Sequence, residues 1–236
     1  YKIKKNIYDK LAKNQINIIF GTHAIFQKKM LFKKLGLIII DEQHKFGVKQ
    51  RKKLSDKGGK NCDILVMSAT PIPRTMIMTI FGDMDVSIIK NKPKNRKEII
   101  TLSKLDKKID EIISFSKKQI KNGNQIFWVC PLIEESKKLD HSSAIKKFEY
   151  LKKKFPNQVC LLHGKTDIDK KNEILNNFLK NKFKILVSTT IIEVGIDFPN
   201  ANVIIIENAN KFGLSQLHQL RGRVGRGNKD STCILM

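Results

Sequence analysis

The stretch Leu37-Ile38-Ile39-Ile40-Asp41-Glu42-Gln43-His44 decides most of what can be expected of this fold. Its first residues are apolar and mostly β-branched, which predicts a buried strand. Two adjacent carboxylates after such a strand are costly unless they cap the next element or bind something. Asp41 can hold Mg²⁺, directly or through water, while Glu42 orients or deprotonates an attacking water. The stretch therefore predicts metal–nucleotide chemistry of the kind that motor ATPases carry out.

Outward from this stretch, short apolar runs alternate with longer amphipathic segments. Strands are expected at Ile16–Phe20, Leu37–Ile40, Ile64–Met67, Val86–Ile89, Gln125–Val129, Val159–Leu162, Ile185–Ser188, Val203–Glu207 and Thr232–Met236. Helices are expected at Arg74–Phe81, Leu105–Asn122, Ser143–Phe155, Ile168–Leu179 and Gln216–Arg221. Apolar strands separated by helices indicate parallel sheets covered on both faces, so the fold class is α/β.

The number of expected strands is too large for one sheet, and a polar stretch divides them. Lys90–Lys97 contains Pro93 and several charges, as expected of a linker. We therefore expect a first lobe at residues 1–92, a linker at 93–104 and a second lobe at 105–236.

Polar clusters follow several expected strands, where ligands of open parallel sheets bind. These clusters are Gly21-Thr22-His23, Asp41–His44, Ser68-Ala69-Thr70 and Ser188-Thr189-Thr190, the last continuing to Gly195 and Asp197. Hydroxyls can bond a neighbouring loop or the phosphate oxygens of a nucleic acid, and Asp197 can accept hydrogen bonds from a ribose or an arginine. Gly195 permits a close backbone approach. The alternative for the last cluster is an ordinary strand-to-helix turn.

The charge of the chain favours polyanionic partners. The formal net charge is +24, from 46 basic and 22 acidic residues. Lysine dominates, as in proteins of AT-rich genomes, so basicity alone says little. The six arginines are more informative, because half of them fall in Arg221-Gly222-Arg223-Val224-Gly225-Arg226. Arginine suits bidentate phosphate contact, and the glycines predict a flexible, cation-dense end to the last helix.

Other features of the composition bear on location. No apolar run approaches membrane-spanning length, and the four cysteines lack metal-type spacing. Cys62, Cys130, Cys160 and Cys233 are expected to be buried small apolar groups in a reducing cytoplasm.

The ordered clusters resemble those of superfamily 2 helicases and translocases, which have two RecA-like lobes. The resemblance is most specific to bacterial RecG-type helicases. It rests on the runs Ile39–Arg51, Met67–Thr75, Phe81–Asp85, Val129–Ser136 and Asn208–Leu220. The related transcription-repair coupling translocases typically have a second Glu where this chain has Gln43, and remain the alternative.

The resemblance implies a role for each cluster. Asp41 and Glu42 would hold Mg²⁺ and polarise water, and Gly195 and Asp197 would line an ATP cleft. Reactive or coupling roles would fall to Gln43, His44, Ser68, Ala69, Thr70, Gln219, Arg223 and the arginine finger Arg226. DNA contacts would fall to Gly21, Thr22, His23, Arg74, Thr189 and Thr190. The partner would be branched double-stranded DNA, namely Holliday junctions and stalled forks, and the protein would act as a monomer without a membrane.

The phosphate-binding loop of this family, Gly-x-x-x-x-Gly-Lys-Ser/Thr, does not precede Asp41 in this chain. Gly164-Lys165-Thr166 has similar letters, but it lies in the expected second lobe and lacks the first glycine at the required spacing. We therefore expect a fragment with an incomplete first lobe, inactive by itself. The other alternative is a decayed remnant that binds DNA without hydrolysing ATP.

Overall fold

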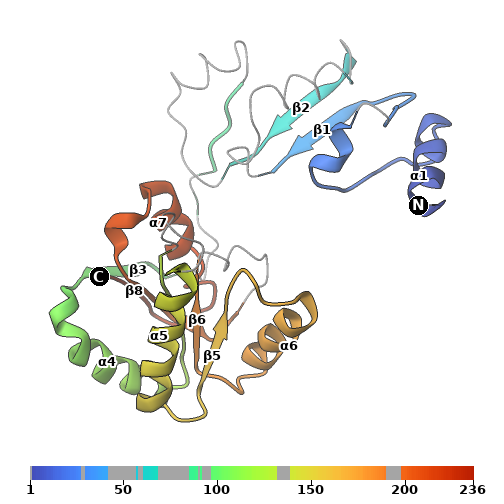
Figure 1. Ribbon diagram of the computed structural model, residues 1–236. Coiled ribbons are helices and arrows are strands. Elements are labelled where there is room, and N and C mark those ends of the chain that lie inside the picture. Colours follow the sequence, from blue (N-terminus) through green and yellow to red (C-terminus); the bar gives the residue numbers. More distant parts are fainter. Residues whose placement is uncertain are drawn as a thin grey trace. The chain divides into compact units, whose positions relative to one another are not determined.

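The structure is a computed structural model that describes residues 2–27, 30–41, 57, 61–68, 85–89, 91, 97–131, 139–189 and 198–236. The chain divides into two compact units, Tyr1–Val86 and Ser87–Met236, shown in Figure 1. Each unit is built around its own parallel sheet. Among the described residues, no helix combines the length and the apolarity that a membrane span needs.

The first unit contains helix α1 (Lys2–Ala12), the short 3₁₀ helix η1 (His23–Phe26) and strands β1 (Leu37–Ile40) and β2 (Asp63–Val66). The two strands are parallel, and Ile38 pairs with Ile64 in their register. Ile38 and Ile40 are buried on one face, whereas Leu37, Ile39 and Leu65 are exposed on the other. The expectation that helices cover both faces is thus not met by the described part of this unit.

The second unit has a six-stranded sheet in the order β3-β8-β7-β4-β6-β5, with every neighbouring pair parallel. Its strands are β3 (Ile99–Ser103), β4 (Gln125–Val129), β5 (Val159–Leu162), β6 (Ile185–Ser188), β7 (Ala201–Ile206) and β8 (Ser231–Leu235). Central strands β4, β6 and β7 are buried at every residue, which explains their continuous apolar sequences.

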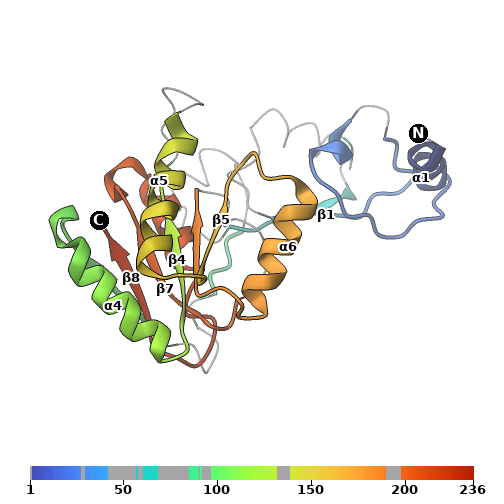
Figure 2. The same ribbon diagram turned by 60° about the horizontal axis from the view of Figure 1, so that its bottom comes forward.

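Helices cover both faces of this sheet, as Figures 1 and 2 show. The helices are α4 (Ile109–Lys121), α5 (Leu139–Lys154), α6 (Ile168–Leu179) and α7 (Leu214–Arg221), with short 3₁₀ turns η4 (Asp106–Lys108) and η6 (Ala209–Lys211). Ile112 of α4 and Leu151 of α5 pack with Trp128 on one face. Phe178 of α6 and Leu220 of α7 pack with Phe127 on the other. This is the α/β arrangement of a RecA-like lobe.

Several sequence predictions fail within the described residues. Ile16–Phe20 and Val86–Ile89 form no strand, and the side chains of Phe20 and Ile89 are 91% and 93% exposed. Apolar runs become strands only when backbone partners lie beside them, and these segments have none among the described residues. The predicted helix Arg74–Phe81 lies outside the described residues.

Residues 93–104 do not serve only as a linker. Ile99–Ser103 within this range is strand β3, which pairs along its whole length with β8. The sheet thereby gains an edge strand whose partner is far away in sequence. The lobe boundaries otherwise stay a prediction.

Candidate nucleotide and nucleic-acid site

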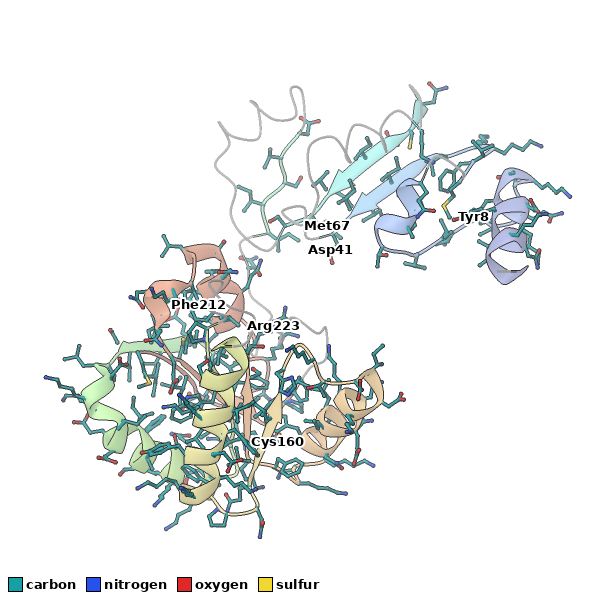
Figure 3. All side chains as sticks on the ribbon, in the orientation of Figure 1. Tyr8, Asp41, Met67, Cys160, Phe212 and Arg223 are labelled. Atoms are coloured by element: carbon teal, nitrogen blue, oxygen red, sulfur yellow. The ribbon has the colours of Figure 1, made fainter. Side chains whose placement is uncertain are left out.

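Two of the predicted clusters meet at the carboxyl edge of the first unit's sheet. Asp41 directly follows β1, and Met67 and Ser68 follow β2. The backbone N–H of Met67 donates to the carbonyl of Ile40 at 2.8 Å, which holds the two strand ends together. Asp41 and Ser68 are both exposed, and Figure 3 shows Asp41 and Met67 projecting from these ends. Carboxylate and hydroxyl oxygens, which these two neighbouring strand ends carry, are ligand types that suit a hard cation such as Mg²⁺.

The remaining members of these clusters lie outside the described residues. They are Glu42, Gln43, His44, Ala69, Thr70 and Arg74. Their roles stay predictions. Among the described residues, no group of three or more His, Cys, Asp or Glu side chains could hold a metal ion.

The Gly21-Thr22-His23 cluster does not follow a strand, so the expectation of a strand-end site fails here. Thr22 instead precedes η1, and its carbonyl accepts the N–H of Ile25 at 3.0 Å. A Cβ added at Gly21 would lie 2.6 Å from Cδ1 of Ile25, so the backbone packs closely against this turn. Thr22 is exposed and available to a phosphate. The side chain of His23 is outside the described set.

The arginine-rich segment is anchored, contrary to the expected flexible end. Val224 is fully buried in the core beneath α7, and Gly225 has a φ of +73°. A Cβ at Gly225 would lie 2.9 Å from Cγ1 of Ile99 in β3. The segment therefore turns tightly over the starts of β3 and β8.

Anchoring gives the arginines defined positions. Arg223 is half-buried, whereas Arg226 is exposed and donates from Nε to the carbonyl of Gly222 at 3.5 Å. Gln219 is half-buried on α7, and its carbonyl lies 3.4 Å from a Cβ built at Gly222. Figure 3 shows Arg223 at the end of α7. Gln219 and both arginines thus belong to one compact end of the helix.

The residues that directly follow the predicted ribose-binding residues lie near the arginine segment. Gly195 and Asp197 lie outside the described residues, but Phe198 follows them directly and is buried in the core. The carbonyl of Pro199 lies 3.3 Å from a Cβ built at Gly227. Pro199, two residues after Asp197 in the sequence, therefore lies close to Gly227, which directly follows Arg226.

Thr189 directly follows β6. It therefore lies at the carboxyl ends of the strands of the second sheet, whereas the arginine segment lies over strand starts. Thr189 is 2% exposed, and its Oγ1, like Oγ of Ser188, has no hydrogen-bond partner within the described part of the chain. A buried hydroxyl without a partner costs free energy unless something else satisfies it. Contact with a phosphate would require exposure of this hydroxyl. Thr190 lies outside the described residues.

The prediction from sequence missed the residues that support the arginine segment. Asn202 donates from Nδ2 to Oδ1 of Asn124 at 3.0 Å, and its Oδ1 accepts the Ser231 hydroxyl at 3.4 Å. The Ser231 hydroxyl also lies 3.4 Å from the carbonyl of Lys229. This buried network joins β4, β7 and β8 beneath the segment. No local pattern could reveal it, because its members are far apart in sequence.

The cysteines take no part in these clusters. Cys130, Cys160 and Cys233 are buried, as expected, whereas Cys62 is half-buried. Desolvation raises the pKa of Cys160 to about 12 and that of Cys233 to about 11. Burial and the nearby Glu207 carboxylate also raise the pKa of Cys130. The buried thiols are therefore neutral and unsuited to metal binding or nucleophilic attack.

Comparisons with known families agree with this arrangement. Residues 92–228 match the helicase conserved C-terminal domain, and residues 2–79 match the DEAD/DEAH box helicase domain. The ATP-dependent DNA helicase RecG of Bacillus subtilis (strain 168) is 50% identical over 237 residues, which cover 100% of this chain and 35% of that protein. RecG of Thermotoga maritima is 49% identical, over 99% of this chain and 30% of its own length.

A solved structure of RecG bound to a three-way DNA junction matches with a TM-score of 0.71 and 44% identity. The match covers 99% of this chain and 30% of that one. The chain therefore belongs to the superfamily 2 helicases, within the RecG type. It spans about a third of the length of the curated relatives it matches.

Proposed function

We propose that this chain forms the motor region of an ATP-dependent DNA helicase that moves along branched duplex DNA. The observation that carries the proposal is the order of clusters, from the acidic pair Asp41–Glu42 to the anchored segment with Arg223 and Arg226. A relative bound to a three-way junction supports branched DNA as the partner. Holliday-junction migration and fork regression are the finer activities that we propose.

In this proposal, Asp41 and Glu42 hold Mg²⁺ and orient the hydrolytic water. The nucleotide supplies the phosphoryl group, and Gly195 and Asp197 contact its sugar. Arg226 acts as the arginine finger, because a guanidinium stabilises negative charge that develops on the transferred phosphoryl group; such residues contribute about 10³ to 10⁵ in rate.

Gln219 and Arg223 belong to the same phosphate-facing end of α7. Gln43, His44, Ser68, Ala69 and Thr70 would relay the nucleotide state to the DNA-binding residues. Thr22 would contact the backbone of the DNA from the first lobe, and Thr190 from the second. Such phosphate contacts position the protein without reading sequence.

The test is equilibrium binding of the 236-residue chain to fluorescent three-way junctions of unrelated sequence. We expect similar dissociation constants for different sequences, and a loss of affinity of tenfold or more between roughly 50 and 200 mM salt. The physical reason is release of counterions when lysine and arginine neutralise phosphates. An affinity that barely responds to salt would contradict the proposal.

A further inference from the structure

Some lysines of the second unit form ion pairs with carboxylates, and others do not. At the edge where the strands end, Lys104 and Lys108 both lie 3.1 Å from carboxylate oxygens of Glu111, and their hydrogen bonds lower its pKa. Lys147 lies 2.6 Å from Glu207, which directly follows β7. Lys104, Lys108 and Lys147 are therefore paired with carboxylates at this carboxyl edge, whereas Lys107, Lys165, Lys170 and Lys211 there form no ion pair among the described residues.

At the opposite edge, where strands begin, Lys97 pairs with Asp230 at 2.8 Å before β3 and β8, but the lysines before β4, β5 and β6 differ. Helices α4, α5 and α6 each lead into the next strand, so their carboxyl ends lie there. We call the lysines of these ends the amino-edge lysines; they are Lys117, Lys118, Lys121, Lys152, Lys153, Lys154, Lys180, Lys182 and Lys184. Within the described part of the chain, none of them forms an ion pair. Lys184 bonds only a neutral amide, Oδ1 of Asn181, at 2.9 Å.

Helix dipoles explain part of this pattern. Cations near the last turn of a helix are stabilised, which accounts for lysines at the ends of α4 and α5. Helix α6, however, has no basic residue in its last turn. Lys180 is the C-cap of α6 and lies in the same field, but Lys182 and Lys184 follow the helix end, so the dipole alone does not account for the basic residues before β6.

Backbone hydrogen bonds connect the segments that carry the amino-edge lysines. The N–H of Lys184 donates to the carbonyl of Gln158, and its carbonyl accepts the N–H of Ile126, both at 2.8 Å. These bonds join the starts of β5, β6 and β4, which are adjacent in the sheet. Neighbouring strands are about 4.8 Å apart, so charges from the three connections lie within reach of consecutive phosphates.

We propose that the amino-edge lysines bind the phosphate backbone of duplex DNA, as a second contact surface apart from the predicted DNA-binding motifs. Thr189 lies at the end of β6 and Lys184 directly before its start, so the two surfaces occupy opposite edges of one sheet. The inference rests on the proposed function, since it assumes that the chain binds DNA.

Duplex DNA fits this surface better than a membrane does. Proteins that bind the membrane interface normally insert apolar side chains beside their basic ones. Of the described side chains in these segments, Leu179 is the exposed large apolar one, and the rest of the exposed surface is polar. The surface therefore offers cations without an apolar anchor.

The test compares two variants with equal loss of charge. The edge variant combines Lys118→Gln, Lys121→Gln, Lys153→Gln and Lys182→Gln. The control variant combines Lys107→Gln, Lys146→Gln, Lys170→Gln and Lys211→Gln, which are exposed elsewhere on the same unit. Both are titrated with a fluorescent duplex at several salt concentrations, and their thermal unfolding is recorded.

We expect the edge variant to bind DNA at least about tenfold more weakly than the parent chain at roughly 0.1 M salt. The slope of the logarithm of its affinity against the logarithm of the salt concentration should fall in magnitude by about 3 to 4, whereas that of the control should fall by less than about 1. Hydrogen exchange of the parent chain should also slow at 117–124, 152–158 and 180–184 when DNA is added.

Equal losses in both variants would overturn the inference, because net charge alone would then explain them. So would lower thermal stability of the edge variant with unchanged DNA affinity, which would indicate a helix-end role. Loss of binding to anionic phospholipid vesicles, again with DNA affinity unchanged, would assign the surface to a membrane. If the parent chain shows no salt-sensitive DNA binding, the proposed function itself fails.

Discussion

Gly225 determines where the arginine segment turns. It combines a φ of +73° with close contact to Ile99, whereas Gly123 has a φ of +80° and open space around its missing Cβ. Gly225→Ala should therefore lower the free energy of unfolding by about 2–4 kcal/mol, and Gly123→Ala by only about 1. Chemical denaturation of both variants measures the difference. Equal losses would show that the contact with Ile99 carries no cost.

Cys233 should make the free energy of unfolding depend on pH. Its folded pKa is raised to about 11 from 9.0, because burial disfavours the thiolate. The resulting stability is fully present below pH 9 and is lost as the pH rises towards 11, by up to about 2 kcal/mol. Denaturation curves between these pH values should fall more steeply for the parent chain than for Cys233→Ala. Parallel pH profiles would contradict the assignment.

At the scale of elements, Gln125 fastens α6 to β4. Its buried Nε2 donates to the carbonyls of Phe178 and Phe183 at 2.7 and 2.8 Å. Gln125→Leu leaves both carbonyls without this donor and should cost about 2–4 kcal/mol in the free energy of unfolding. Gln158→Leu is the matched control, because Oε1 of Gln158 is buried and the described residues offer it no hydrogen-bond partner. Its cost should be below about 1 kcal/mol, and a larger cost there than at Gln125 would refute the argument.

Which elements could be predicted from sequence follows from the range of their interactions. Central strands such as β4 are apolar because both faces are buried, so their own residues reveal them. Strand β3 was missed because only Ile99 is partly buried, and its ladder with β8 begins at Ser231. Helix α1 was missed because Leu11 is its one buried side chain among those described. Pairing with distant residues cannot be read from a local pattern.

At the scale of the whole 236-residue chain, the expected activity depends on the phosphate-binding loop, whose sequence these residues do not contain. Backbone amides and a lysine of that loop normally hold the β and γ phosphates, and no such sequence precedes Asp41 here. We expect negligible ATP hydrolysis by the 236-residue chain on branched DNA, measured as phosphate release. Robust DNA-stimulated turnover that Glu42→Gln abolishes would contradict this prediction.

The motifs alone could not show at which ends of the strands their residues lie. Their order along the chain predicted candidate site residues, including Asp41, Ser68 and Arg223. It could not indicate that the arginine segment crosses the starts of β3 and β8 while Thr189 follows the end of β6. Edges of a sheet are defined by strand order and direction, which depend on the entire chain.

Trp128 gives the second unit a built-in optical probe. It is the only tryptophan of the chain, its side chain is fully buried, and its indole N–H donates to Glu207 at 2.9 Å. Fluorescence excited at wavelengths selective for indole therefore comes from the second unit alone. A red shift of its emission reports when water reaches that core, and melting of the first unit by itself leaves the indole in the same surroundings.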